Sequence, residues 1–337
     1  MTNKNYKLEI KKLGNAEIEI DLQISAEKLA EQRKKIVKRY KENLELPGFR
    51  KGNAPEKMII EKVGEARILE DAAEEAIKEI YPQILLEHKI EAIGRPEVTI
   101  TKLALGNELG VKIKTSIVPE VKLADYKKIA SEDKNPIEED PEVGDDEVEK
   151  VIDSVRQARK QEDGKLPELD QDFVKELGNF TDLEDLKQKI KQNLKEEKKH
   201  QQKNKKRTAI LEKIIKDSEI ELPEILVRGE LEKMLAQFKE EIEVAGMSFK
   251  DYLEKTKADE EKIRQDWRPQ AEKRAQSQLV LNKIAAVEKI TADPKILEQE
   301  VEKVIKEYPG ADRNRAEIFV ETILINTAVL EFLENQQ

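Results

Sequence analysis

One long helical stretch sets the limits on the fold of this chain. Apolar side chains recur at helical spacing from Leu183 to Leu194 and again from Ile210 to Ile215, whereas residues 195–207 between them carry none. An amphipathic helix buries its apolar stripe against a neighbouring element. The stretch is therefore expected to form a helix that is packed at both ends and exposed to water in the middle. Such a helix suits a thin frame better than one large globule.

The amino-acid composition supports the same conclusion. Asp, Glu, Lys and Arg make up 40% of the 337 residues, against about 25% in an average globular protein. Aromatic residues make up only 4%, so the core must be mainly aliphatic. The length suggests two or three domains. We predict an α+β domain followed by a mostly α-helical, elongated domain with several arms.

Residues 1–118 are predicted to form the α+β domain. Apolar residues alternate over residues 18–24, after a turn signal at Gly14, and over residues 109–113, after Gly106. This alternation predicts two antiparallel hairpins, each with one apolar face. Helical spacing between them predicts helices at about 26–40, capped by Ser25, and at 55–63 and 65–88.

Residues 119–165 are predicted to be an extended acidic connector that ends in a helix. This segment contains three prolines, an acidic run at 138–140 and few apolar residues after Tyr126, so it cannot fold alone. Asp145 or Asp146 is the expected cap of its helix.

Residues 166–337 are predicted to be helical throughout. Thr181 and Glu184 have the spacing of a capping box at the start of the long helix. Pro269 predicts a kink in a later helix at about 259–288, because proline lacks the backbone N–H that the helix needs.

Several functional classes are disfavoured by what the sequence lacks. There is no cysteine, neither of the two histidines has a metal-ligand spacing, and no phosphate-binding loop motif is present. We expect no cofactor, no metal and a cytoplasmic location. No apolar run approaches the roughly 18 residues of a membrane span, and the net charge of -10 argues against nonspecific DNA binding. An enzyme with an unrecognised carboxylate site stays open with 72 acidic residues, although no paired spacing stands out.

The loop before Pro55 is the sharpest candidate for a binding site. Glycines and prolines in it predict a turn that holds an aromatic side chain beside two cations, which suits an anionic, partly apolar partner. In the alternative interpretation the loop only joins two helices and its Phe folds back into the core. The candidate residues are Gly48, Phe49, Arg50, Lys51 and Gly52.

A second set of candidates lies in the helical segment. Flexible thioethers and flat aromatic rings adapt to varied apolar segments, although helical spacing favours core packing for each of these residues singly. The candidates are Met234, Phe238, Met247, Phe249 and Trp267. The basic tract 195–207, which we expect to be a solvated face, is a weaker candidate for RNA contact.

Three motifs carry a resemblance to a known family. The motif Gly48-Phe49-Arg50-Lys51-Gly52 with Pro55 resembles the signature of the bacterial trigger factor family. The stretch 268–274, continued by the apolar pattern to Ile290, resembles that family's C-terminal arm helix, and residues 166–174 are similar to the start of its helical domain. The three motifs follow the family's order and together span most of the chain.

The resemblance implies an ATP-independent chaperone. The motif residues Phe49, Arg50 and Lys51 would dock on the large ribosomal subunit at the nascent-chain exit, and the helical body would shield nascent or unfolded polypeptides. A free-standing holdase or scaffold that no longer docks on the ribosome is the alternative, and a homodimer is left open.

Two departures from the family pattern matter. Asn53 stands where the family usually has Lys, which removes one cation from the loop. The FKBP-type prolyl isomerase domain that members usually carry has no room, because the helix ending near Lys160 runs almost directly into Leu166. We therefore expect a shortened member that is not an enzyme.

Overall fold

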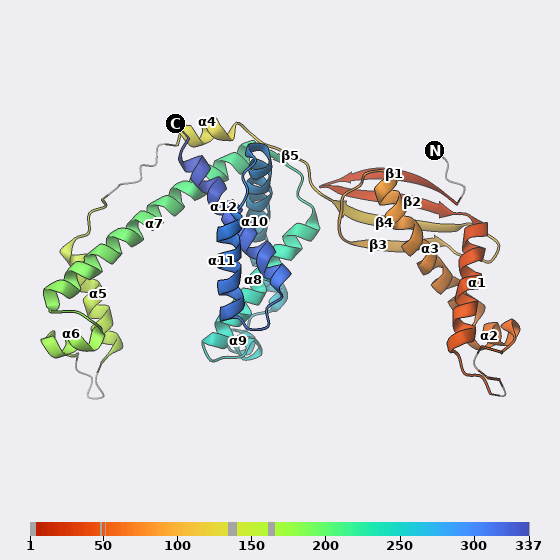
Figure 1. Ribbon diagram of the computed structural model, residues 1–337, viewed down its shortest axis with the longest axis horizontal. Helices are drawn as coiled ribbons and strands as arrows, with labels where there is room; N and C mark the ends of the chain where they lie inside the picture. Colours follow the sequence, from red (N-terminus) through yellow and green to blue (C-terminus); the bar gives the residue numbers. More distant parts are fainter. Residues whose placement is uncertain (1–4, 48, 51, 134–139, 161–165, 337) are drawn as a thin grey trace. The chain divides into compact units, whose positions relative to one another are not determined.

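A computed structural model describes residues 5–47, 49–50, 52–133, 140–160 and 166–336 (Figure 1). The chain divides into two compact units, and each is described by itself. Unit 1 comprises Met1–Lys122 and Ile220–Gln276, and unit 2 comprises Leu123–Glu219 and Ser277–Gln337.

Unit 1 begins with a four-stranded antiparallel sheet of order β1-β2-β4-β3. Ile18, Ile20, Leu22 and Ile24 alternate along β2 and are all buried, whereas the residues between them are more exposed. The alternation predicted from the sequence is confirmed for both hairpins. The strands are β1 (Tyr6–Gly14), β2 (Glu17–Ile24), β3 (Ala92–Lys102) and β4 (Leu109–Ile117), followed by the short β5 (Val121–Lys122).

Three helices complete this N-terminal domain. Ser25 caps α1 as predicted, because its side chain accepts a hydrogen bond from the Lys28 N–H. The apolar faces of α1 and α3 pack on the sheet, so that strands and helices share one core of buried residues. The helices are α1 (Ala26–Asn43), α2 (Glu56–Val63) and α3 (Glu65–Glu87).

The C-terminal part of unit 1 is a smaller helical arm. Its core contains Val227, Leu231, Met234 and Ala271, with Trp267 packed against them. The arm is built from α8 (Glu224–Val244), α9 (Phe249–Thr256) and the first part of α10 (Glu260–Glu288), which follow the short strand β6 (Glu219–Ile220).

Unit 2 contains the long helix that the apolar pattern predicts, α7 (Leu183–Asp217). Its buried residues, Leu186, Ile210 and Ile214, lie toward its two ends, and no side chain in 195–207 is buried. The expectation of a helix packed only at its ends is confirmed. The other helices are α4 (Tyr126–Ser131), α5 (Asp145–Ala158), α6 (Gln171–Leu177), α11 (Pro294–Glu307), α12 (Arg313–Glu334) and the last part of α10.

Two predicted caps are wrong by one or two residues. Asp182, rather than Thr181, caps α7, because the Asp182 carboxylate accepts the N–H of Asp185 at 2.9 Å. A carboxylate next to the predicted hydroxyl is an equally good cap. Helix α5 begins after Gly144, whose backbone N–H donates to the Glu147 carboxylate at 3.2 Å.

The connector contains a helix that the sequence analysis missed. Helix α4 is short and is anchored by its side chains: Tyr126 Oη donates to Glu288, and Lys127 Nζ lies 2.8 Å from the same carboxylate. Burial, followed by the bond to Glu288, raises the pKa of Tyr126 to about 12. Tertiary contacts therefore stabilise a helix too short to form alone.

Candidate functional site

The candidate loop joins α1 to α2, and hydrogen bonds hold its base. The Gly52 N–H donates to the Lys41 carbonyl at 3.1 Å, and the Phe49 N–H donates to the Leu46 carbonyl at 3.0 Å. Gly52 has a φ of +86°, in the left-handed region that favours glycine. Leu46 and Ala54 on the two sides of the loop are buried in the domain core.

The apex of the loop faces outward. The Phe49 side chain is 39% exposed and Arg50 is exposed, so the alternative in which Phe49 folds back into the core is wrong. Gly48 and Lys51 lie outside the described residues. Of the five motif residues, the structure therefore places an exposed ring and one exposed cation on a loop with a fixed base.

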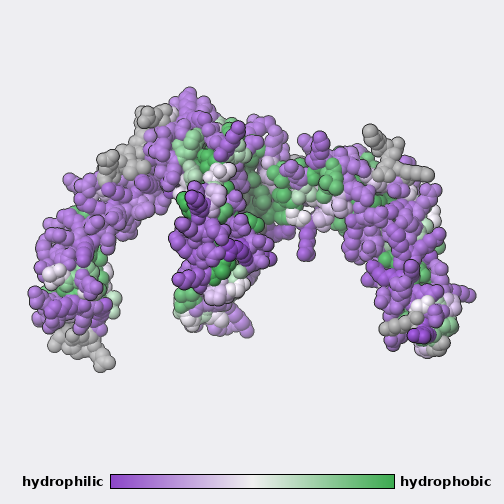
Figure 2. All heavy atoms as spheres, in the orientation of Figure 1, coloured by the Kyte–Doolittle hydropathy of each residue, from purple (hydrophilic) through white to green (hydrophobic). Residues whose placement is uncertain are grey.

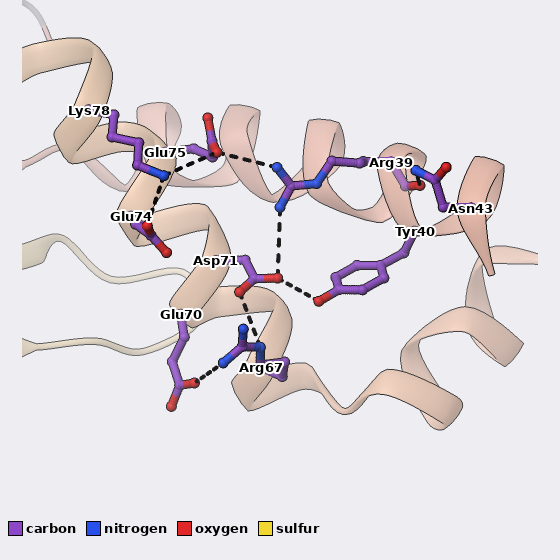
Figure 3. Close-up of polar contacts among 9 residues, drawn as sticks. All are labelled: Arg39, Tyr40, Asn43, Arg67, Glu70, Asp71, Glu74, Glu75 and Lys78. Atoms are coloured by element: carbon purple, nitrogen blue, oxygen red, sulfur yellow. Dashed lines mark hydrogen bonds and ion pairs between the residues drawn. The ribbon is translucent and has the colours of Figure 1, made fainter. Parts of the chain in front are cut away.

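A buried carboxylate under the loop was missed by the sequence analysis. Asp71 of α3 is 7% exposed and accepts a hydrogen bond of 2.6 Å from Tyr40 Oη (Figure 3). Arg67 Nε lies 3.2 Å from Asp71 Oδ1, and an Arg39 nitrogen lies 3.9 Å from Oδ2. The Leu44 N–H donates to the Tyr40 carbonyl at the end of α1. This network fixes the end of α1 from which the loop departs, and a charged residue inside the apolar stripe of α3 was the signal for it.

Two further ion pairs join α1 to α3. The Arg33 guanidinium donates two hydrogen bonds, of 2.6 and 2.8 Å, to the Glu65 carboxylate. These bonds hold the pKa of Glu65 below its usual 4.5. Lys28, which is buried, donates to Glu79 at 2.6 Å and holds the pKa of that carboxyl below 4.5 as well. The helices that carry the loop are therefore tied together by charge as well as by apolar packing.

The second set of predicted residues is partly brought together in the arm of unit 1. The Phe238 ring lies edge-on to Trp267, with centroids 5.2 Å apart, and edge-on to Phe249 at 6.3 Å. Tyr252, which the sequence analysis did not single out, lies edge-on to Phe238 at 5.2 Å. Such ring pairs contribute more stabilising free energy than their buried area alone accounts for. The arm therefore presents a partly exposed cluster of four aromatic rings, Phe238, Phe249, Tyr252 and Trp267, which we call the aromatic cluster.

The two methionines differ from each other. Met234 is buried in the arm core, where it also lines a cavity of about 220 Å³ together with Phe238 and Trp267. Met247 is half-buried, and its backbone N–H donates to the Ile242 carbonyl. Met234 supports the cluster from beneath, and Met247 lies in the turn that leads into α9.

An apolar surface on α12 was missed entirely. Ile318 is 65% exposed, Phe319 59% and Ile323 46%. Ala316 and Val320 of α12 pack on α11. By helix geometry Ile318 lies opposite this contact, whereas Phe319 and Ile323 flank it. Helix α12 is apolar on more than one side, so the spacing of its residues could not tell the packed side from the free one.

Two lysines of the basic tract of α7 pair with the connector, although no side chain of the tract is buried. Lys195 Nζ lies 2.7 Å from Asp140, and Lys198 Nζ lies 2.7 Å from Glu147 and 2.7 Å from the Glu142 carbonyl. Hydrogen bonds from these lysines hold the pKa values of Asp140 and Glu147 below their usual values. We call the segment 140–147 the acidic clasp. Figure 2 shows that hydrophilic residues dominate the visible surface of this region.

Neither a membrane span nor a metal site is found in the part of the chain that the structure describes. No described helix is both long and apolar enough to cross a bilayer. No group of three or more His, Asp or Glu side chains among the described residues is arranged to hold a metal ion.

Comparison with known proteins points to one family. The family described as "Bacterial trigger factor protein (TF)" matches residues 6–155, and "Bacterial trigger factor protein (TF) C-terminus" matches residues 182–335. Trigger factor from Clostridium botulinum is 25% identical, with 94% of this chain and 95% of the relative covered. Trigger factor from Caldicellulosiruptor bescii is also 25% identical, with 97% and 96% covered.

A solved structure shares the fold. It is described as "Promiscuous Substrate Recognition in Folding and Assembly Activities of the Trigger Factor Chaperone" and aligns with a TM-score of 0.55 at 19% identity. The alignment covers 97% of this chain and 99% of the other. The predicted fold class, an α+β domain followed by helical arms, is confirmed. The alignment with the Clostridium relative extends over 410 residues, more than the 337 of this chain, so that relative has segments without a counterpart here.

Proposed function

Because this chain belongs to the bacterial trigger factor family, a family of ribosome-associated chaperones, we propose that its own docking site is the exposed apex of the α1–α2 loop. The observation that carries this proposal is Phe49, a large apolar side chain left 39% exposed next to Arg50 on a loop whose base is buried. Arg50 and Lys51 would pair with ribosomal anions at the nascent-chain exit, and Phe49 would fill an apolar site there.

Client polypeptides would bind at the helical arms. The aromatic cluster and the exposed side chains Ile318, Phe319 and Ile323 of α12 supply separate apolar surfaces on charged supports. Exposed apolar surfaces on such a support commonly mark binding sites. Many weak apolar contacts delay aggregation and still release the client without nucleotide. The division of labour that we propose is docking by 1–118, connection by 119–165 and client holding by 166–337, in the cytoplasm.

Co-sedimentation with ribosomes tests the docking site. Changing Phe49, Arg50 and Lys51 together to Ala should abolish binding and leave the melting temperature nearly unchanged, because exposed loop residues contribute little to folding. A matched control replaces Lys203, Lys205 and Lys206 of the basic tract, none of which has an ion pair among the described residues, with Gln. Loss of binding in the control but not in the loop variant would place docking on α7.

Photo-crosslinking tests the client surface. A crosslinker at Phe249 or Phe319 should capture an unfolded client, whereas one at Glu149, an exposed residue of α5, should not. Capture at Glu149 alone would move client binding to the connector.

We further propose that the chain has no prolyl isomerase activity. The segment between α5 and α6 is too short to hold the family's isomerase domain. Uncatalysed isomerisation takes tens to hundreds of seconds, so a proline-limited refolding reaction leaves a clear window for the assay. Acceleration by a sample free of contaminating isomerases would overturn this proposal.

The free-standing holdase or scaffold remains the second candidate. It is favoured by Asn53, which removes a cation from the loop, and by the net charge of -10. Suppression of aggregation without any ribosome binding would select it.

A further inference from the structure

An apolar groove opens at the end of the N-terminal domain opposite the docking loop. It has a volume of about 390 Å³ and lies where β1 and β2, the end of β4 and the turn from α3 into β3 meet. We call it the end groove. The lining residues on which its chemistry depends are the apolar Ile18, Ile117 and Val118 and the charged Lys12, Lys89 and Glu91.

Position along the strands separates the groove from the loop. Ile18 lies near the start of β2, whereas Ile24 at its other end leads through Ser25 into α1 and only then to the loop. Figure 1 shows α2 beyond one end of the sheet and the exit of the chain toward β5 beyond the other. Docking through Phe49 would therefore leave the end groove open.

Hydrogen bonds hold the walls of the groove in place. The Val118 N–H donates to the Glu91 carbonyl at 2.8 Å, and the Ile117 N–H donates to the Ala16 carbonyl at 2.8 Å. The Ile90 N–H donates to the Leu85 carbonyl at 2.8 Å, which closes the turn after α3. The groove is a preformed feature of the domain frame.

The rim of the groove is positively charged. Lys12 and Lys89 have no ion-pair partner among the described residues, although acidic residues outnumber basic ones in the chain. Glu91 is the single acidic residue in the lining. Lys89 also has a φ of +53°, in the left-handed region where a helix commonly ends with glycine. The turn itself therefore gives no reason for a lysine at this position.

The apolar lining of the groove is partly open to solvent, because Val118 is 50% exposed. An apolar lining with unpaired cations beside it complements a ligand that is apolar and negatively charged at adjacent positions.

From this complementarity we infer that the end groove binds extended segments of unfolded polypeptide in which large apolar side chains alternate with Asp or Glu. The apolar side chain would enter the groove, and the neighbouring carboxylates would pair with Lys12 and Lys89. This inference rests on the proposed function, because it names a class of client, but it uses neither the docking loop nor the arms.

Peptide binding to the full-length chain tests the inference. Fluorescein-labelled peptides of alternating Leu and Asp, Leu and Lys, or Ser and Asp are compared by fluorescence anisotropy at low salt. The Leu/Asp peptide should bind most tightly. Changing Lys12 and Lys89 together to Glu should weaken its binding by roughly tenfold or more and favour the Leu/Lys peptide, because the rim charge is reversed. Val118→Asp should weaken binding of both Leu peptides at this site.

Lys102→Glu is the matched control, because it reverses an exposed lysine of β3 that does not line the groove. It should leave Leu/Asp binding unchanged. Equal loss in the control, or an unchanged charge preference in the Lys12/Lys89 variant, would overturn the inference. A concentration-dependent dimer that Val118→Asp abolishes, with no peptide bound at the groove, would also overturn it and assign the groove to a second copy of the chain.

The same variants separate this inference from the proposed function. Groove variants should still co-sediment with ribosomes through the loop, and the Phe49/Arg50/Lys51 variant should still bind the Leu/Asp peptide. Failure of peptide binding with intact sedimentation would reject the groove alone. Failure of sedimentation with intact peptide binding would reject the docking proposal alone.

Discussion

The N-terminal domain and the helical arms differ in the size of their buried cores. In the domain, one core unites three helices with a four-stranded sheet, and Ile20, Ile68 and Ile80 are almost completely buried. In unit 2, the core of the α5–α7 arm consists of Val143, Val148 and Ile152, and the core of the α11–α12 arm is of similar size. A surface that must present one loop in one place benefits from a rigid support. In the arms, the side chains proposed to bind clients stay partly or largely exposed.

The largest expected difference comes from a cavity in each core. Ile68→Ala should destabilise the N-terminal domain by about 2–5 kcal/mol, because the surrounding core cannot collapse around the missing atoms. Ile152→Ala should cost about 2 kcal/mol, at the lower end of this range, because a small cluster near solvent relaxes more easily. Denaturant unfolding combined with hydrogen exchange measures both. Equal losses would show that the arm core is as rigid as the domain core.

The Asp71 network should give the next largest effect. Tyr40→Phe removes a hydrogen bond to a buried carboxylate and should cost about 1–3 kcal/mol, with weaker co-sedimentation with ribosomes because the base of the loop loosens. Tyr308→Phe, which changes an exposed tyrosine between α11 and α12, is the control and should leave stability and sedimentation unchanged. Full sedimentation by the Tyr40 variant, despite lower stability, would mean that the network supports the fold alone.

Lowering the pH should reduce the stability of both regions. The pKa values of Glu65 in the domain and of Asp140 and Glu147 in the acidic clasp are lowered by their cationic partners. A carboxyl with a lowered folded pKa stabilises the fold above its unfolded pKa, and this contribution is lost as pH falls through the folded pKa. We expect the denaturant concentration at the unfolding midpoint to decrease once the pH is below about 4. The clasp should be released while the domain core persists. Proteolysis at the connector, followed across this pH range, reports the clasp. Simultaneous loss of both regions would contradict the comparison.

The smallest effect should come from the clasp at neutral pH. Changing Lys195 and Lys198 to Gln removes exposed ion pairs, which contribute little and are screened by salt. The melting temperature should not change measurably, whereas backbone exchange over residues 140–147 should become faster and lose its dependence on salt. Lys203→Gln, which changes a cation with no such pair, is the control. A large drop in stability would mean that the clasp holds unit 2 together.

The sequence predicted the elements well where one periodicity dominated. Alternation predicted both hairpins, and the polar interruption predicted that the middle of α7 is not buried, but it did not predict the ion pairs of Lys195 and Lys198. Prediction failed for α4, because this helix depends on Glu288, which is distant in sequence. It also failed for the cap of α7, because the neighbouring Asp182 is as good a cap as the predicted Thr181. The candidate site followed the same rule. A local motif identified the loop, but the Asp71 support and the free face of α12 depend on how helices pair, which spacing alone does not specify.

The unburied middle of α7 also fixes the angle, measured about the helix axis, between the apolar faces at the two ends of that helix. Each residue turns an α-helix by about 100°, and no side chain in 199–206 is buried to resist insertion or deletion. Adding two full turns there would lengthen the helix and keep Leu186 and Ile210 on their present faces. Adding two residues would swing one apolar end to nearly the opposite side. The number of residues in this tract can therefore change only by nearly whole helical turns if both apolar ends are to keep their present faces. The tract acts as a spacer that also fixes the angle between these two faces.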